Sequence, residues 1–459
     1  MLLYRRDEMT RTLFYGRAVT KEEVSSELLD LLAVEGIESL PALRCFKHNI
    51  QCVRCGNDQR SEFSKIPCSC GENCMYCLSC MQMSQLRLCS KLWHLQEEND
   101  FFSIKKPILT WQGRLSQQQA EASQAIVYSI KNNETRLIWA VAGAGKTEML
   151  FEGIAYALAE KKRVCLASPR IDVCLELMPR LKQAFAHVDF ITLYGEMTES
   201  YRYTQMVLAT THQLLRFKEA FDVLIIDEID AFPYKDNKSL YYATERARKK
   251  CSTLIYLTAT PDQKMQDSVR KQKLLASILP ARYHGHALPE PRLVWSGNWS
   301  HQVLKQPQKS KIIKIMQEKL RKKRRFLVFV PNIKWMHLFE EICKKFFPIN
   351  TFTSVYSQDS KRQEKVMAMR EDKLDFLITT TILERGVTFK NIDVLVIGSE
   401  EKIYTESALV QIAGRAGRSF DYPKGDVILF HHGRSKAMKL AVKQIRQMNH
   451  LARKKGLIN

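Results

Sequence analysis

The sequence has no run of 18 or more apolar residues, so no segment is long enough to span a bilayer as a helix. Its N-terminus has no apolar core of the kind found in signal peptides, because charged residues at Arg5–Glu8 interrupt it early. Short-period repeats and low-complexity tracts are also missing. These absences argue against export and membrane insertion. We expect a cytoplasmic globular protein, either free or peripheral at the inner face of the membrane.

Acidic residues are scarce relative to basic ones. The chain has 49 Asp and Glu against 71 Lys and Arg, a net charge of +22. Such an excess indicates a polyanionic partner, most commonly nucleic acid, although an anionic membrane surface would attract it too. Two basic stretches are either phosphate-binding surfaces or ordinary solvated helix faces. They comprise Lys309, Lys311, Lys314, Lys319 and Arg321–Arg325, and then Lys436, Lys439, Lys443, Arg446, Arg453, Lys454 and Lys455.

Short apolar runs alternate with helix-length segments in two successive sets. This pattern is typical of buried parallel strands with crossover helices, so we expect an α/β fold with two tandem parallel-sheet domains. Prolines at 280, 289 and 291 indicate a linker between the sets. The expected segments are an N-terminal segment 1–50, a cysteine module 51–95, and domains 105–290 and 291–459. The runs are Leu137–Val141, Val164–Ala167, Met206–Ala209, Val223–Ile226 and Leu254–Leu257, then Phe326–Val330, Thr351–Val355, Phe376–Thr379, Val394–Ile397 and Val427–Phe430.

A phosphate-binding loop follows the first apolar run. Glycines at 143 and 145 let backbone N–H groups surround a β-phosphate, and the helix that follows adds the positive end of its dipole. Lys146 is expected to reach the β- and γ-phosphates, and Thr147 to bind Mg²⁺. The expected ATP-binding residues are Ala140, Val141, Ala142, Gly143, Ala144, Gly145, Lys146 and Thr147, with alanine in the first position where glycine is commoner.

Two acidic residues end the run Val223–Ile226. Carboxylates at the carboxyl end of a buried strand suit Mg²⁺ binding, so Asp227 is expected to bind the metal. Glu228 is placed to polarise the attacking water. With the phosphate loop about eighty residues upstream, this pair indicates an ATPase rather than a helix cap.

Further segments resemble the helicases and translocases of superfamily two: Asp227–Asp230, Thr258–Thr260 (Thr-Ala-Thr) and Gln411–Arg418. The resemblance implies two RecA-like domains with ATP between them. It implies that Gln411, Arg415 and Arg418 face that ATP. Because the two arginines are three residues apart, we expect them on one helix face. From there both would stabilise the charge of the transition state.

Two weaker similarities concern the adenine and the nucleic-acid track. Leu115–Gln119 resembles the element that recognises adenine through a glutamine, and Gln119 is the candidate; a polar helix start would look the same. Thr379–Val387 resembles the block that couples the track to the nucleotide, with Thr380 and Arg385 as candidates.

Seven of the thirteen cysteines lie between positions 52 and 80. Two C-x-x-C pairs separated by 21 residues fit a structural four-cysteine zinc site, and this segment contains no histidine. The expected zinc ligands are Cys52, Cys55, Cys77 and Cys80. Three surplus cysteines could replace a pair or bind a second ion with Cys89: Cys68, Cys70 and Cys74.

The N-terminal cysteine module, Asp227–Pro233, Thr379–Val387 and Gln411–Arg418 together resemble the ComFA family of competence ATPases. The resemblance implies a motor using ATP and Mg²⁺ that pulls single-stranded DNA through the ComEC membrane channel, with ComFC and DprA as partners. Two alternatives stay open: a helicase of repair or replication restart, and a nucleic-acid-binding scaffold without turnover. The N-terminal position of the cysteines favours ComFA over the former, and the retained motor residues argue against the latter.

Overall fold

The structure is a computed structural model that describes residues 11–24, 36–46, 49–81, 83–195, 197, 199–418, 422 and 425–458. Its contacts divide the chain into two compact units, each continuous in space but not in sequence. Among the described helices, none is both long and apolar enough to cross a membrane. The first unit comprises Met1–Ile138, Thr147–Leu257 and Lys264–Ala276, and the second comprises Trp139–Lys146, Thr258–Gln263 and Ser277–Asn459.

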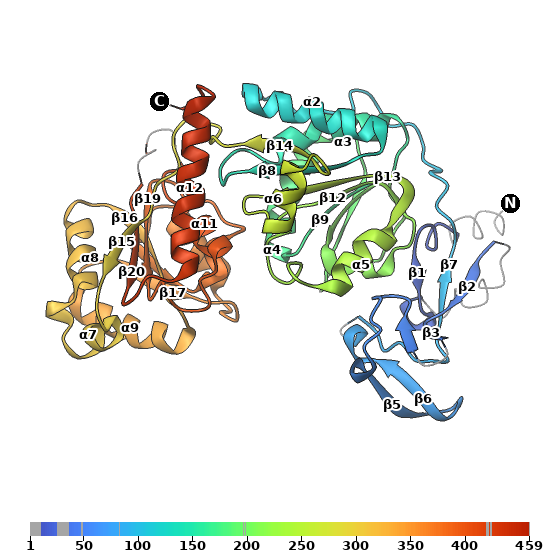
Figure 1. Cartoon of the computed structure of the whole chain (residues 1–459), viewed down its shortest axis with the longest axis horizontal. Helices are drawn as coiled ribbons and strands as arrows, with labels where there is room; N and C mark the ends of the chain where they lie inside the picture. Colours follow the sequence, from blue (N-terminus) through green and yellow to red (C-terminus); the bar gives the residue numbers. More distant parts are fainter. Residues whose placement is uncertain are drawn as a thin grey trace. The chain divides into compact units, whose positions relative to one another are not determined.

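The first unit begins with a module of small antiparallel sheets (Figure 1). One sheet has the order β1-β7-β2, and two hairpins, β3–β4 and β5–β6, lie between β2 and β7 in the sequence. Its apolar cluster is small, centred on Phe14, Val19 and Leu95. A module with so little core needs another source of stability. Its strands are β1 (Ala18–Val19), β2 (Glu38–Pro41), β3 (Leu43–Phe46), β4 (Asn49–Cys52), β5 (Phe63–Cys68), β6 (Gly71–Cys77) and β7 (Lys91–His94).

A seven-stranded sheet follows, in the order β10-β11-β9-β12-β13-β8-β14. The ladders that join β10, β11, β9, β12 and β13 are parallel. Every residue of β9 and β11 is buried, as expected for strands covered on both faces. The strands are β8 (Thr135–Ala140), β9 (Val164–Ser168), β10 (Phe190–Leu193), β11 (Met206–Thr210), β12 (Phe221–Ile226), β13 (Arg248–Thr258) and β14 (Leu275–Leu279), and the helices are α2 (Gln117–Asn132), α3 (Phe151–Ala159), α4 (Ile171–Ala184), α5 (Lys238–Ala247) and α6 (Gln263–Arg270).

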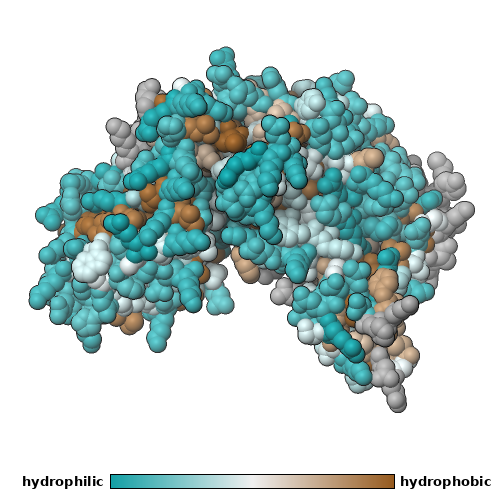
Figure 2. All heavy atoms as spheres, viewed as in Figure 1, coloured by the Kyte–Doolittle hydropathy of each residue, from teal (hydrophilic) through white to brown (hydrophobic). Residues whose placement is uncertain are grey.

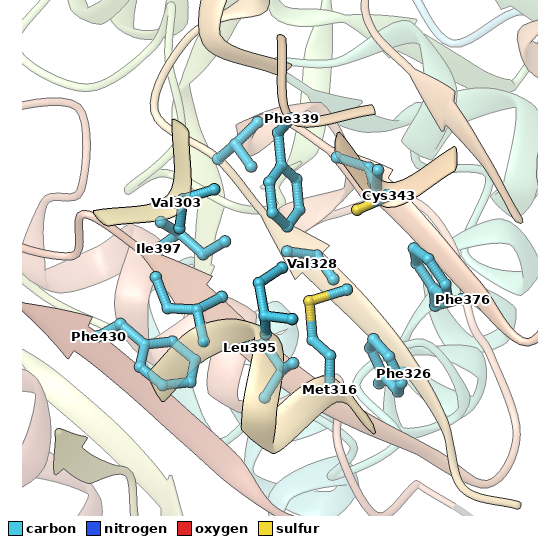
Figure 3. Close-up of a cluster of buried hydrophobic side chains, with 14 of the residues drawn as sticks. Val303, Met316, Phe326, Val328, Phe339, Cys343, Phe376, Leu395, Ile397 and Phe430 are labelled. Carbon is cyan, nitrogen blue, oxygen red and sulfur yellow. The ribbon is translucent and has the colours of Figure 1, made fainter. Parts of the chain in front are cut away.

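The second unit contains a six-stranded parallel sheet in the order β15-β20-β19-β16-β18-β17. Its core mixes aliphatic and aromatic side chains, with Phe326 and Phe376 among them (Figure 3). The rings of Phe326 and Phe352 both stack on Phe376, with centroids 5.1 and 4.5 Å away. The strands are β15 (Arg292–Trp295), β16 (Arg325–Phe329), β17 (Phe352–Val355), β18 (Phe376–Thr379), β19 (Ile392–Ile397) and β20 (Val427–His431), and the helices are α7 (Trp299–Lys305), α8 (Lys311–Arg321), α9 (Ile333–Phe346), α10 (Arg362–Arg370), α11 (Glu406–Ala413) and α12 (Lys436–Lys454).

The predicted fold class, two tandem RecA-like parallel-sheet domains after an N-terminal cysteine module, is confirmed. Each predicted apolar run overlaps a strand. No strands were predicted for the N-terminal module, and in the two large sheets three were overlooked, β10, β14 and β15, each at an edge of its sheet. An edge strand has one neighbour, so the residues of β14 and β15 are mostly exposed or half-buried rather than fully buried.

Candidate nucleotide site and cysteine centre

The phosphate loop follows β8 directly. Gly143 and Gly145 have φ angles of +83° and +72°, a left-handed conformation that disfavours residues with a Cβ. The Ala144 amide donates to the Val141 carbonyl at 3.1 Å and tightens the turn. After the loop, the chain forms a short 3₁₀ turn at Glu148–Leu150 before α3 begins. The backbone therefore agrees with a phosphate cradle, while the role of Lys146 stays a prediction.

The acidic pair lies at the carboxyl end of β12. The Asp227 amide donates to the Ala167 carbonyl of the neighbouring strand β9 at 2.8 Å, which fixes Asp227 at this edge of the sheet. The Asp227 carboxylate accepts a hydrogen bond from the Glu228 amide at 2.9 Å. Glu228 has a φ of +56°, uncommon for a residue with a side chain. Strain of this kind is found at functional sites, where the fold fixes a side chain in one direction.

The arginine motif differs from the prediction. Helix α11 ends at Ala413, so Arg415 and Arg418 do not share a helix face. They lie in the turn that follows, where the amides of Arg415 and Ala416 donate to the carbonyls three residues back, and Gly417 then adopts a left-handed φ of +63°. Arg415 is buried and donates from Nε to the Glu384 carbonyl at 3.0 Å. Arg418 donates to the Gly414 carbonyl at 2.8 Å.

Within the second unit, this turn and the phosphate loop share a buried arginine that the sequence did not single out. Arg282 is only 1% exposed; its guanidinium donates to the Gly417 carbonyl, and the adjacent Tyr283 amide donates to the Gly143 carbonyl at 3.0 Å. Burial, and then the charge of Arg418, lower the pKa of Arg282 to about 9. Among the described residues, its Nε and Nη2 have no hydrogen-bond partner. A buried, under-paired cation of this type is suited to an anion.

Gln411 is buried on α11, and its Nε2 likewise has no partner among the described residues. Gln119 is different. It is the third residue of α2, and its side-chain oxygen accepts the Ser116 amide at 2.8 Å in a capping box. Gln119 thus has a structural task of its own, as a polar helix start would require, and adenine recognition stays a prediction.

Two of the helicase-like segments meet at a serine that no motif identified. The Thr260 hydroxyl donates to the Ser407 hydroxyl at 2.9 Å, and Arg385 donates to the same oxygen at 2.8 Å. Arg385 is 1% exposed, so it acts inside the second unit rather than at its surface. The segment after β13 and the Thr379–Val387 block are therefore joined through one hydroxyl on α11.

The first four predicted cysteines converge. Cys52 ends β4, Cys55 lies in the turn after it, and Cys77 and Cys80 lie at and just after the end of β6. All four are buried, and their sulfurs lie within 4.8 Å of one another, with Cys52–Cys80 and Cys55–Cys77 both at 3.6 Å. With Zn–S bonds of about 2.3 Å, a tetrahedral site has S–S edges of about 3.8 Å. The cluster fits one zinc ion.

The turn at Cys52–Cys55, called the knuckle below, is connected to the first α/β domain. Gly56, at φ +72°, packs so closely on Tyr242 of α5 that a Cβ would lie 2.4 Å from its Cγ. Arg54, between the two cysteines of the knuckle, donates to the Glu23 carboxylate, which also accepts from Arg216 at 2.8 Å. Burial raises the pKa of Glu23, but the two guanidinium groups outweigh it and hold the pKa below its ordinary value.

The basic stretches separate into structural and exposed groups. Lys319 is buried and donates to Asp393 and Asp426 at 2.6 and 2.9 Å, and Arg324 donates to Asp393 at 2.5 Å. These two side chains are engaged in ion pairs with carboxylates of the second unit, so their charges are already compensated. Hydrophilic side chains cover much of the visible surface (Figure 2). An open groove along α12 is lined by Arg292, Arg434, Lys439, Lys443, Arg446 and His450.

Comparison with known proteins adds three family matches. Residues 5–94 match the competence protein ComFA N-terminal domain, residues 112–263 the type III restriction enzyme res subunit, and residues 308–420 the helicase conserved C-terminal domain. The chain is 45% identical to competence protein ComFA of Bacillus subtilis over 411 residues, 89% of this chain and 87% of that protein. The chain belongs to the ComFA family.

A second ComFA, from Streptococcus pneumoniae, is 38% identical over 436 residues and covers 95% of this chain and 98% of its own. The fold is similar to that of Mss116p bound to single-stranded RNA and AMP-PNP, with a TM-score of 0.55, 18% identity and 69% of each chain covered. RecG bound to a three-way DNA junction gives a TM-score of 0.50 at 17% identity, over 74% of this chain and 45% of RecG. This ComFA-family chain is thus a helicase-like, ATP-dependent enzyme of superfamily two.

Proposed function

We propose that this protein is an ATP-driven translocase that pulls incoming single-stranded DNA into the cytoplasm during natural competence. The observation that carries the proposal is the contact of Thr260 and Arg385 with Ser407. A motor must pass a change at the nucleotide to the residues that hold the track. The Ser407 hydroxyl, which both helicase-like segments contact, is a direct route for this change. If either segment moves, the hydrogen bond of the other segment to Ser407 changes as well.

We assign the nucleotide chemistry to two segments, the phosphate loop and the acidic pair Asp227–Glu228. Lys146 neutralises the β- and γ-phosphates, Thr147 and Asp227 bind the Mg²⁺ that accompanies ATP, and Glu228 orients and polarises the attacking water. The left-handed backbone at Gly143 and Gly145 supports the cradle, and the fixed position of Asp227 at the sheet edge supports the metal role.

The arginines and Gln411 complete the charge balance of the reaction. Arg415 and Arg418 stabilise negative charge on the transferring phosphoryl group. Arg415 is held by the Glu384 carbonyl, so its guanidinium is positioned before the substrate arrives. The Gln411 amide nitrogen, which has no hydrogen-bond partner within the part of the chain that the structure describes, supplies a further donor.

Single-stranded DNA is the proposed track. The net charge of +22 favours a polyanion, and the cationic groove along α12 supplies exposed groups for a sugar-phosphate backbone. Contacts of this type read no bases, so we expect little dependence on sequence. Binding should weaken with salt, with a log–log slope of about −0.7 for each neutralised phosphate of a single strand.

The cellular setting is proposed from family membership. The protein would work on the cytoplasmic side of the membrane, at the inner mouth of the ComEC channel, with ComFC and DprA as partners. The four-cysteine cluster would bind a structural zinc ion and stiffen the knuckle that rests on Tyr242.

Displacement of streptavidin from the biotinylated end of a single strand tests translocation directly. The wild-type protein should displace it in the presence of ATP. Lys146→Ala should neither hydrolyse ATP nor displace, and Glu228→Gln should bind ATP but act slowly. Glu160→Gln, at an exposed carboxylate near the end of α3, is the matched control and should behave as wild type. ATP turnover without any streptavidin displacement would reject translocation. DNA binding without ATP turnover would favour the alternative of a nucleic-acid-binding scaffold.

A further inference from the structure

A second group of cysteines gathers at the far end of the β5–β6 hairpin from the first. The sulfurs of Cys68, Cys70, Cys74 and Cys89 all lie within 4.8 Å of one another. Cys89 lies 3.7 Å from both Cys68 and Cys74. We propose that these four thiolates bind a second zinc ion, independent of the ion bound by Cys52, Cys55, Cys77 and Cys80.

The backbone explains how an unusual ligand spacing closes around one ion. Cys68 ends β5, Cys70 lies in the hairpin turn, and Cys74 lies on β6. The ladder is regular down to Ile66, then shifts register so that Cys68 pairs with Gly71. Gly71 has a φ of +139°, which lets the chain reverse tightly. A C-x-C spacing that would be awkward in a regular turn is therefore accommodated by an irregular one.

The sulfur distances distinguish a metal site from disulfides. A disulfide joins sulfurs at about 2.05 Å, whereas the contacts here are 3.7 Å. That distance agrees with the edge of about 3.8 Å expected for a tetrahedral zinc–sulfur site. It also agrees with the 3.6 Å contacts of the first cluster.

The surroundings of the second cluster suit a charged metal centre. Zinc with four thiolates carries a net charge of −2, so nearby cations stabilise it. Arg87 donates from Nη1 to the Cys68 sulfur at 3.6 Å. Cys74 is buried, while Cys70 and Cys89 are exposed, so this ion should exchange more readily than the first.

The two sites cannot share ligands. Cys74 and Cys77 are three residues apart on β6, and side chains an odd number of residues apart point to opposite faces of a strand. The first ion would tie one face of the hairpin to the turn after β4, and the second would tie the other face to the segment before β7. Two metal cross-links would thus stabilise a module that has only a small apolar core.

Elemental analysis of the purified full chain tests the proposal. Wild-type protein should contain two zinc ions per chain, Cys89→Ser and Cys52→Ser one each, and the exposed Cys45→Ser two. One ion in the wild type, lost in Cys52→Ser and kept in Cys89→Ser, would overturn the second site. So would a disulfide between Cys68 and Cys89 found by alkylation and mass spectrometry of freshly purified protein.

A second measurement avoids relying on a variant that could misfold. After exchange of zinc for cobalt, the wild-type visible absorption should rise linearly to two equivalents of Co²⁺ and then stop. Saturation at one equivalent would contradict the proposal. A weak chelator should first remove half of the bound metal, the ion of the more exposed second cluster. Cys89→Ser should lack this rapidly removed fraction.

Discussion

Arg54, in the turn between Cys52 and Cys55, donates a hydrogen bond to the Glu23 carboxylate at 2.5 Å. The Arg54 side chain is fully buried, and that of Glu23 is 9% exposed. Glu23 also accepts from Arg216 in the first α/β domain at 2.8 Å. One carboxylate thus joins the knuckle to the motor, and its loss would leave two guanidinium groups without their common partner.

Glu23→Gln should lower the stability of the first unit by about 3 kcal/mol at neutral pH, the usual cost of breaking a buried pair. Because the folded-state pKa of Glu23 is lowered, the stabilisation is complete above the ordinary value of 4.5 and is lost as pH falls through the folded-state value. Thermal unfolding of wild type and variant should therefore converge at acidic pH. Glu22→Gln, at the exposed neighbouring carboxylate, should change little; equal effects of the two variants would contradict this assignment.

Arg418→Ala should retain ATP binding, because the phosphate loop is intact, and should lose turnover by about 1,000-fold, the range measured for catalytic arginines. Nucleotide affinity and steady-state hydrolysis measured side by side separate the two effects. Arg270→Ala removes an exposed arginine on α6 and serves as the control. Normal hydrolysis by Arg418→Ala would place this side chain away from the phosphoryl group.

Cys52→Ser should release the zinc ion of the first cluster, since a buried four-sulfur site tolerates no missing ligand. Limited proteolysis should then cleave within residues 50–90 while the α/β domains stay resistant. ATP hydrolysis in the absence of DNA should persist, because the nucleotide residues lie outside the module. Loss of the whole fold on zinc removal would show that the motor depends on the module for its folding.

The sequence revealed the motor because its signals are local. A phosphate loop, an acidic pair after a buried strand and two C-x-x-C pairs each occupy a few consecutive residues, and each lies where its pattern indicated. The edge strands β14 and β15 were overlooked because a strand at an edge need not be apolar on both faces. Arg415 and Arg418 were expected on a helix because their spacing alone does not show that the helix ends at Ala413 and that Gly417 adopts a left-handed φ.

Contacts between distant segments could not be predicted. Arg282 and Ser407 belong to no motif, and their importance follows from what packs beside them: the Gly417 carbonyl for the former, Thr260 and Arg385 for the latter. The second cysteine cluster is similar. Its spacing alone left several groupings open, and only the shifted register near Gly71 shows how its four sulfurs meet.

ATP turnover measured in parallel with single-stranded DNA, duplex DNA and RNA tests the central claim most directly. Single-stranded DNA of any sequence should raise the rate, with much smaller effects of duplex and RNA, and the stimulation should decline steeply with salt. Three results would contradict a single-stranded DNA translocase: equal stimulation by duplex and single-stranded DNA, stronger stimulation by RNA, or stimulation that does not change with salt concentration.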